Sequence, residues 1–174
     1  RKNSMFRALL INSENDKPRI SELSEDVLRR DGVLVKVEYS TLNYKDCLAI
    51  LHGKPIIRKY PMVTGIDFSG TVLNDPSSGF KEGSKVLMTG FGMGEKFWGG
   101  HSELASVDAS FLLNIPSGFT MKNAMQCGTA GLTASMAVLK LRDFGLKPES
   151  GEILVTGASG GVGTISILLL KKLG

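Results

Sequence analysis

The sequence has few residues of the kinds that mark secreted, metal-binding or membrane-spanning chains. It holds 2 cysteines among 174 residues, Cys47 and Cys127, at positions 80 residues apart. This spacing excludes a disulfide framework and a paired-cysteine zinc motif, and it favours a reduced, cytoplasmic setting. No apolar run reaches the ~18 residues of a membrane-spanning helix, and the first residues lack the apolar stretch of a signal peptide.

The sequence also lacks an excess of charge of one sign. Lys and Arg number 21 and Asp and Glu 17, which leaves a net charge of +4 and no basic block. The densest basic pairs, Arg29-Arg30 and Lys171-Lys172, are typical of solvated helix faces. We therefore expect neither a nucleic-acid partner nor a membrane partner, and expect a small-molecule substrate.

Glycine, in contrast, is in excess. The chain has 21 glycines in 174 residues, where the usual share is about 7%. They gather at 90–100, 128–131 and 157–163. Clustered glycine indicates places where the backbone comes close to another group.

Short strands at close spacing are predicted up to residue 115. Apolar or alternating runs predict strands at 6–11, 33–39, 66–73, 85–89, 101–107 and 111–115, with a short helix at 43–51. Such spacing favours a compact β barrel or sandwich.

The pattern changes after Pro116. Apolar residues recur at helical intervals over 122–141, and Gly128 and Gly131 interrupt them, which predicts two helices that meet at a corner. The continuous apolar run 152–156 predicts a buried parallel strand. A glycine-rich turn at 157–163 and an apolar helix at 164–173 follow it.

Strand, glycine-rich turn and helix, in that order, open a dinucleotide-binding unit. Ala158, Gly160 and Gly163 have the spacing of that turn, with alanine in the first place. Gly160 would let the backbone approach a pyrophosphate, Gly163 would let the helix pack closely, and the free N–H groups at the helix start favour phosphate. A tight turn without a ligand is the alternative.

The nucleotide site predicted in this way is incomplete. The residue that reads the ribose is expected about 20 residues after the glycines, and the sequence ends at Gly174. One strand and one helix cannot build a parallel sheet. We therefore expect this chain to be the N-terminal part of a longer protein, or to take its partner strands from elsewhere.

Five sequence runs carry a resemblance to a known family. They are LNYKD at 42–46, GIDFSG at 65–70, WGG at 98–100, CGTAGLTA at 127–134 and VTGASGGVG at 155–163. Over residues 5–174 the chain resembles the medium-chain dehydrogenase/reductase superfamily. Within it, the zinc-independent quinone oxidoreductase-like branch, and the acrylyl-CoA reductases that use NADPH, are the most similar.

The resemblance implies a mixed α/β fold in two domains. A GroES-like β-barrel catalytic domain is expected at 1–121. The connecting helices and the first βα unit of a truncated Rossmann NADP-binding domain are expected at 122–174. The full-length protein is expected to be a homodimer, paired through the nucleotide domain.

The resemblance also implies hydride transfer from NADPH to an activated C=C bond, with acryloyl-CoA reduced to propanoyl-CoA. An NADPH-dependent quinone reductase is one alternative. An incomplete, non-catalytic fragment of such an enzyme is another.

A catalytic zinc ion is not expected. The zinc alcohol dehydrogenases of this superfamily place Cys where Asn43 stands, His where Ile66 stands and a second Cys near Cys127. Asn43 and Ile66 cannot supply the three protein ligands that catalytic zinc needs. Cys127 is therefore interpreted as a small buried residue in preference to a reactive thiol.

Reduction of an enoyl thioester places negative charge on the thioester oxygen, which needs hydrogen-bond donors, and the α carbon then needs a proton. The candidates beside the reacting centre are Tyr44 and Asn43. By resemblance, Tyr44 also lies against the nicotinamide, and the alternative for it is a half-buried tyrosine at a helix start. The interpretation of Lys45 is a solvated side chain, with attraction of phosphate or carboxylate as the alternative.

The remaining cofactor candidates lie in the two later glycine clusters. Thr129 is expected under the nicotinamide, with ordinary helix capping as the alternative. The phosphate turn is expected to be lined by Ser159, Gly160, Gly161 and Val162.

Other polar residues have weaker signals. Asp46 and Asp67 are interpreted as hydrogen-bonded structural residues. His52 and His101 have no partner visible from their spacing and are assigned no role. The loop 90–100 shapes a substrate pocket or is a plain surface loop.

Overall fold

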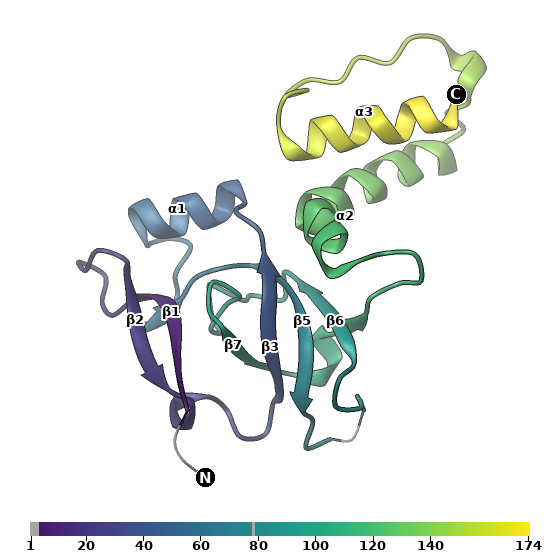
Figure 1. Cartoon of the computed structure of the whole chain (residues 1–174). Helices are drawn as coiled ribbons and strands as arrows, with labels where there is room; N and C mark the ends of the chain where they lie inside the picture. Colours follow the sequence, from purple (N-terminus) through teal and green to yellow (C-terminus); the bar gives the residue numbers. More distant parts are fainter. Residues whose placement is uncertain (1–3, 78) are drawn as a thin grey trace. The chain divides into compact units, whose positions relative to one another are not determined.

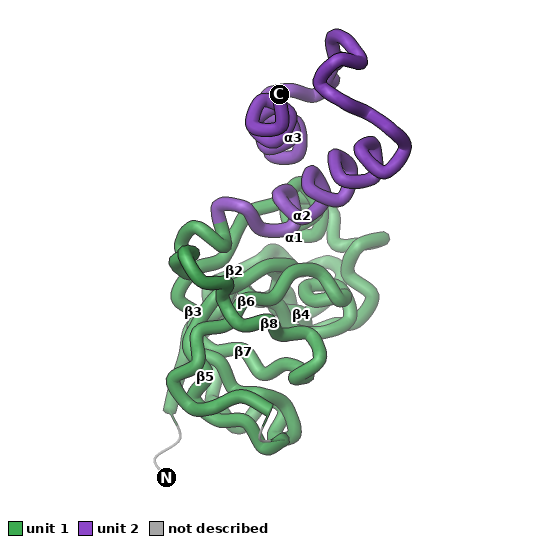
Figure 2. The backbone as a smooth tube through the Cα atoms, turned by 90° about the vertical axis from the view of Figure 1, so that its right-hand side faces the viewer, with its two compact units in different colours: residues 1–125 green, residues 126–174 purple. Residues whose placement is uncertain are grey.

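The computed structural model describes residues 4–77 and 79–174. They divide into two compact units, 1–125 and 126–174, drawn in green and purple in Figure 2. The sequence predicts the domain boundary between residues 121 and 122. The observed division, between residues 125 and 126, lies four residues further along the chain.

Unit 1 is built from two antiparallel sheets (Figure 1). The first has the order β2 (Arg19–Ser24), β1 (Met5–Ile11), β4 (Met62–Val63). The second has the order β7 (Leu104–Val107), β3 (Val33–Ser40), β5 (Asp67–Asn74), β6 (Lys85–Thr89), β8 (Leu113–Asn114).

Backbone hydrogen bonds join the two sheets into a barrel-like unit. The Leu9 N–H donates to the His101 carbonyl over 2.8 Å, and the Glu103 N–H donates to the Arg7 carbonyl over 2.9 Å. The segment that leads into β7 therefore lies beside β1 of the other sheet. This arrangement agrees with the compact β barrel that the strand spacing predicts.

The period-2 pattern of β3 explains how its sheet covers the core. Val33 and Val35 are buried, while Lys36 and Glu38 on the alternate positions are exposed. Inside, the valines meet Phe68 of β5, which is fully buried. Burial of each such side chain contributes about 1.5–3 kcal/mol to the free energy of unfolding.

Four strands of unit 1 differ from their predictions. β8 covers only Leu113–Asn114 of the strand predicted at 111–115, because the 3-10 turn Ala109–Phe111 takes up its start. β2 and β4 are not predicted, because β2 has no buried face and β4 has only two residues. Their pairing with β1 makes them strands. The predicted strand at 101–107 is shorter, since β7 begins at Leu104 after the bonds that join the sheets.

Before α2 (Met121–Asp143) begins, the helical elements of unit 1 are short. They are the 3-10 turns Glu25–Val27 and Ala109–Phe111 and the helix α1 (Tyr44–His52), and α1 confirms the helix predicted at 43–51.

Two α-helices account for most of unit 2. α2 (Met121–Asp143) starts within unit 1 and breaks at Gly128, whose φ of 50° and ψ of −154° are not helical. The break confirms the predicted corner between two helices. The 3-10 turn Pro148–Ser150 and α3 (Gly161–Leu173) follow. No helix in the described part of the chain has the length and apolar character that crossing a bilayer requires.

The strand predicted at 152–156 is wrong. Residues 152–156 have no strand pairing, and Figure 1 draws them as a loop that leads back to α3. Leu154 is 89% exposed. A strand needs a neighbour for its backbone N–H and C=O groups, and the apolar sequence alone does not supply one.

Tyr60 carries a stability prediction. Its hydroxyl oxygen is buried and has no hydrogen-bond partner within the described residues, and burial raises the pKa of the phenol. Because an unsatisfied buried hydroxyl costs about 1–3 kcal/mol, we expect Tyr60→Phe to raise the free energy of unfolding by about 1 kcal/mol. Urea denaturation of both proteins measures the change, and a loss of stability would contradict it.

Candidate functional site

The start of α1 is held by a buried carboxylate. Asn43 precedes the helix with extended backbone, and its N–H donates to Asp46 Oδ2 over 2.8 Å. Asp46 is 1% exposed, and its other oxygen accepts from the Ile66 N–H over 3.0 Å. Asp46 thereby connects the helix start to the residue before β5.

The Asn43 side chain joins Asp46 to a second buried carboxylate. Its Nδ2 lies 3.0 Å from Asp67 Oδ2 and 3.2 Å from Asp46 Oδ2. Asp67 is fully buried at the start of β5. Carboxylate oxygens only accept, so the nitrogen of the Asn43 carboxamide faces both of them. The expectation that Asp46 and Asp67 are hydrogen-bonded is confirmed.

Thr41 completes this group, which we call the Asn43 cluster: Thr41, Asn43, Asp46 and Asp67. The Thr41 hydroxyl donates to Asp67 Oδ2 over 2.9 Å and accepts from Asn43 Nδ2 over 2.7 Å. Because the amide nitrogen contacts three protein oxygens, its N–H groups are engaged within the chain. The role of Asn43 is therefore chiefly to fix the backbone at the start of α1, where Tyr44 follows it.

Tyr44 lies next to this rigid group and is itself open. It is the first residue of α1 and is 80% exposed. That exposure excludes, for unit 1 as described, the alternative of a half-buried tyrosine. A rigid backbone thus presents a ring and a hydroxyl that are accessible to a ligand.

The next residue, Lys45, contacts the glycine-rich loop. Its ammonium pairs with the carboxylate of Glu95, whose side chain is 13% exposed. The interpretation of Lys45 as a merely solvated lysine is therefore wrong. The pair connects the first turn of α1 to the loop 90–100.

His101, assigned no role from the sequence, supports Thr41. Its Nε2 lies 2.8 Å from the Thr41 carbonyl oxygen, and its Nδ1 lies 2.8 Å from the Thr64 hydroxyl. A carbonyl only accepts, so Nε2 carries the hydrogen. No local signal could reveal this contact, because 60 residues separate the two partners.

Close backbone packing explains part of the glycine excess at 90–100. A Cβ on Gly99 would lie 2.1 Å from the Gly65 carbonyl oxygen and 2.5 Å from that of Thr64. In turn, the Gly99 N–H donates to the Val63 carbonyl over 2.7 Å. Only glycine lets the loop pass this close to the segment that leads into the Asn43 cluster.

In unit 2 the glycine-rich turn at 157–163 has the predicted tight geometry. The Gly160 N–H donates to the Gly157 carbonyl over 3.0 Å, and Gly160 then caps α3. A Cβ on Gly163 would lie 2.2 Å from the Gly157 carbonyl oxygen, so the helix packs directly on the turn. Ser159, Gly160, Gly161 and Val162 are all exposed along it.

The α3 start offers donors for an anion. An α-helix leaves its first N–H groups without intrahelical acceptors, and no backbone acceptor in the described chain is found for those of residues 161–163. Together with the positive end of the helix dipole, they fit a phosphate group.

The α2 corner holds two other predicted residues. Thr129 is half-buried directly after the break at Gly128, and its carbonyl accepts from the Thr133 hydroxyl over 2.8 Å. Cys127 is exposed, so the expectation of a buried cysteine is wrong. Cys127 lies on an exposed face of α2, and the position on the helix, more than the apolar character of the side chain, sets its exposure.

Among residues 4–77 and 79–174, no three His, Cys, Asp or Glu side chains lie close enough together to hold a metal ion.

Comparison with known proteins places this geometry in a family. The alcohol dehydrogenase GroES-like domain model matches residues 29–117, half of the chain. The acrylyl-CoA reductase AcuI of Ruegeria pomeroyi is 46% identical over 98% of this chain and 53% of its own length.

Two solved structures are also similar. That of YhfP from Bacillus subtilis, with NAD bound, superposes with a TM-score of 0.93 at 43% identity, over 97% of this chain and 52% of its own. YhfP is named a putative quinone oxidoreductase. YhdH from Escherichia coli, with bound NADPH, gives a TM-score of 0.90 at 47% identity, over 96% and 52%. The chain spans about half the length of the relatives it matches.

Proposed function

Because this chain belongs to the alcohol dehydrogenase GroES-like domain family, we propose that it forms part of an oxidoreductase that transfers hydride from NADPH to an activated C=C bond. The proposed substrate is acryloyl-CoA, reduced to propanoyl-CoA. The observation that carries this proposal is the 46% identity, over 98% of the chain, with an acrylyl-CoA reductase.

The residues of unit 2 fit the proposed cofactor. NADPH, when bound, supplies the hydride. The N–H groups of residues 161–163 bind a phosphate of its pyrophosphate, next to Ser159, Gly160, Gly161 and Val162. Gly163 keeps the helix close enough to the turn for these donors to converge. Thr129, at the α2 corner, contacts the nicotinamide in this proposal.

Unit 1 supplies the groups proposed to act on the substrate side. The exposed Tyr44 orients the nicotinamide ring and donates a hydrogen bond from its hydroxyl. Asn43 belongs to the proposed catalytic residues through its position, because the Asn43 cluster fixes the backbone that presents Tyr44.

The proposed reaction needs no metal ion. Asn43 and Ile66 offer no ligand of the kind that catalytic zinc requires. Activity retained after exhaustive chelation would support this point, and activity restored only by added zinc would overturn it.

We further propose that the full-length protein is a homodimer and is cytoplasmic. The two free cysteines are in keeping with the reducing conditions of the cytoplasm.

A quinone is the second candidate substrate, favoured by the 43% identity with YhfP. NADPH oxidation followed at 340 nm, with acryloyl-CoA and with a benzoquinone at equal concentration, separates the two. We expect the higher kcat/KM with acryloyl-CoA, and a higher value with the quinone would reverse the assignment. If NADPH binds but is not oxidised in either assay, the chain is a non-catalytic fragment of such an enzyme. If NADPH does not bind, the proposed cofactor is rejected.

A substitution at Tyr44 tests the proposed chemistry directly. We expect Tyr44→Phe to lower kcat about tenfold, since a positioned hydrogen-bond donor contributes at least that much. Tyr39→Phe is the matched control, because Tyr39 is also an exposed tyrosine of unit 1. Unchanged kinetics in Tyr44→Phe would reject a role for the hydroxyl.

A further inference from the structure

Unit 1 contains a cavity that the Asn43 cluster does not line. Its volume is about 320 Å³, at the lower end of the range for small-ligand sites. Its apolar lining comprises Val27, Leu28, Met93, Phe97, Trp98 and Phe111.

The direction of β3 separates one wall of the cavity from the Asn43 cluster, while the other wall belongs to the loop 90–100, which contacts Lys45 through Glu95. Ser106 and Val107 line the cavity and pair with Leu34 and Val33 at the start of β3. The Asn43 cluster follows the other end of the same strand. Eight strand residues span on the order of 25 Å, so this wall of the cavity is remote from Tyr44.

Aromatic rings shape the apolar part of the cavity. Phe111 stacks on Phe91, with ring centroids 4.7 Å apart and planes 10° from parallel, and Phe97 lies 5.9 Å from Phe111 at 53°. Trp98 is held by its Nε1–H, which donates to the Pro61 carbonyl over 2.8 Å. Fixed rings of this kind favour a flat aromatic ligand.

Two lysines at the cavity, Lys59 and Lys96, carry positive charges that no acidic side chain pairs with in the described part of the chain. Lys59 and Lys96 follow two residues whose backbones are joined, since the Arg58 N–H donates to the Glu95 carbonyl over 2.9 Å. Both lysines are exposed, and over residues 4–77 and 79–174 neither forms an ion pair. An anion at this rim would therefore find two free ammonium groups.

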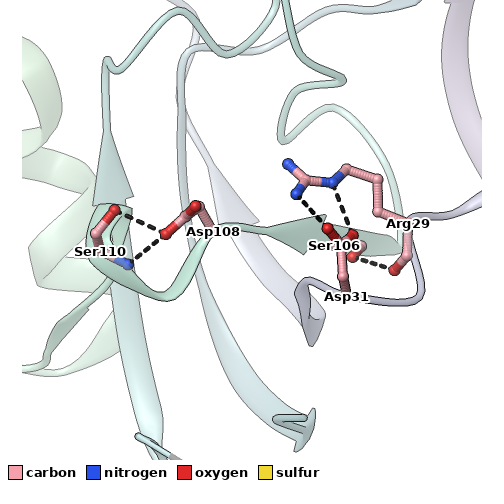
Figure 3. A network of polar contacts seen from close by, with 5 residues as sticks. All are labelled: Arg29, Asp31, Ser106, Asp108 and Ser110. Carbon is pink, nitrogen blue, oxygen red and sulfur yellow. Dashed lines mark hydrogen bonds and ion pairs between the residues drawn. The ribbon is translucent and has the colours of Figure 1, made fainter. Parts of the chain in front are cut away.

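The lining also includes Arg29 and Asp108, whose polar contacts are drawn in Figure 3. The Arg29 guanidinium binds both oxygens of Asp31, over 3.1 and 2.9 Å, and lowers the pKa of that carboxyl. Asp108 accepts from the N–H and the hydroxyl of Ser110 over 2.9 and 2.7 Å. Arg29 is thus compensated by Asp31, whereas Asp108 keeps its negative charge, so a bound anion would turn its negative group away from Asp108 and toward Lys59 and Lys96.

We propose that this cavity binds an aryl carboxylate, with the ring among Phe97, Trp98 and Phe111 and the carboxylate at Lys59 and Lys96. This site is additional to the NADPH and thioester sites of the proposed function and does not depend on them. Its ligand class follows from the aromatic lining and the unpaired lysines together.

Calorimetric titration of the 174-residue chain with 2-naphthoate tests the proposal. We expect saturable binding, and binding of neutral 2-naphthamide that is at least fivefold weaker. The double variant Lys59→Gln/Lys96→Gln should bind the carboxylate about fivefold to tenfold more weakly, as expected for two exposed charges. The matched control is Lys36→Gln/Lys85→Gln, which removes two exposed lysines outside the cavity.

A blocking variant locates the binding. Val27 is 54% exposed and lines the cavity, so Val27→Trp should fold, fill the space and abolish 2-naphthoate binding. NADPH binding should be unchanged in this variant. Equal affinity for 2-naphthamide, or full binding by Val27→Trp, would overturn the proposal. Self-association that Val27→Trp abolishes would also overturn it, because the cavity would then be an interface between copies of the chain.

Discussion

Asn43→Ala is expected to lower the free energy of unfolding by about 3 kcal/mol. The substitution removes the amide that contacts Asp46 and Asp67, which are 1% and 0% exposed. A buried charged group that loses its partner costs far more than an average hydrogen bond contributes. Urea denaturation, with the midpoint and the slope both measured, gives the change.

The control for this result is Asn114→Ala, because Asn114 is exposed on β8. We expect a change within about 0.5 kcal/mol there. Asn43→Asp is a stricter variant, since it keeps the shape and replaces the donor with a third carboxylate. Because three carboxylates would then face one another without the amide donor, we expect Asn43→Asp to lose at least as much stability as Asn43→Ala. A loss below 1 kcal/mol in Asn43→Ala would contradict the role given to the amide.

Gly99→Ala is the second large effect we expect, a loss of about 3 kcal/mol of stability. The added methyl group would meet backbone oxygens of Gly65 and Thr64 at 2.1 and 2.5 Å, and backbone cannot swing aside as a flexible side chain does. The strain falls on the segment that carries Thr64 and Ile66. Those residues contact His101 and Asp46, so the geometry around Tyr44 should suffer as well.

Gly79→Ala is the matched control, because a Cβ there finds its nearest neighbour at 3.4 Å, an ordinary contact. Thermal unfolding of the two variants separates steric overlap from the general cost of replacing glycine. If both variants unfold at the temperature of the parent chain, close packing at Gly99 is not needed for stability.

Local patterns predicted the elements of this fold where the chain itself supplies their neighbours. The alternation of 33–39 predicted β3 because its partners β5 and β7 lie within the same unit. The same kind of evidence failed at 152–156, where the run is as apolar as a buried strand but has no partner. A strand is a property of a pair, and only tertiary structure shows whether the pair exists.

The candidate site divides in the same way. Gly128, Gly160 and Gly163 were recognised from spacing, because a helix break and a glycine-rich turn depend on residues only a few positions apart. The Asn43 cluster joins residues 24 positions apart and the His101 contact joins residues 60 apart, so no local signal carries them.

The sequence by itself determined the family resemblance, the β domain before a helical unit, and the glycine-rich turn before α3, since each depends on residue type at short spacing. Tertiary structure alone decided that Asn43 bridges two buried carboxylates, that Lys45 pairs with Glu95 and that Cys127 is exposed. It also decided where an aromatic cavity with two unpaired lysines lies. These features depend on which distant segments pack together, and packing sets the partners, burial and charge balance of every polar side chain.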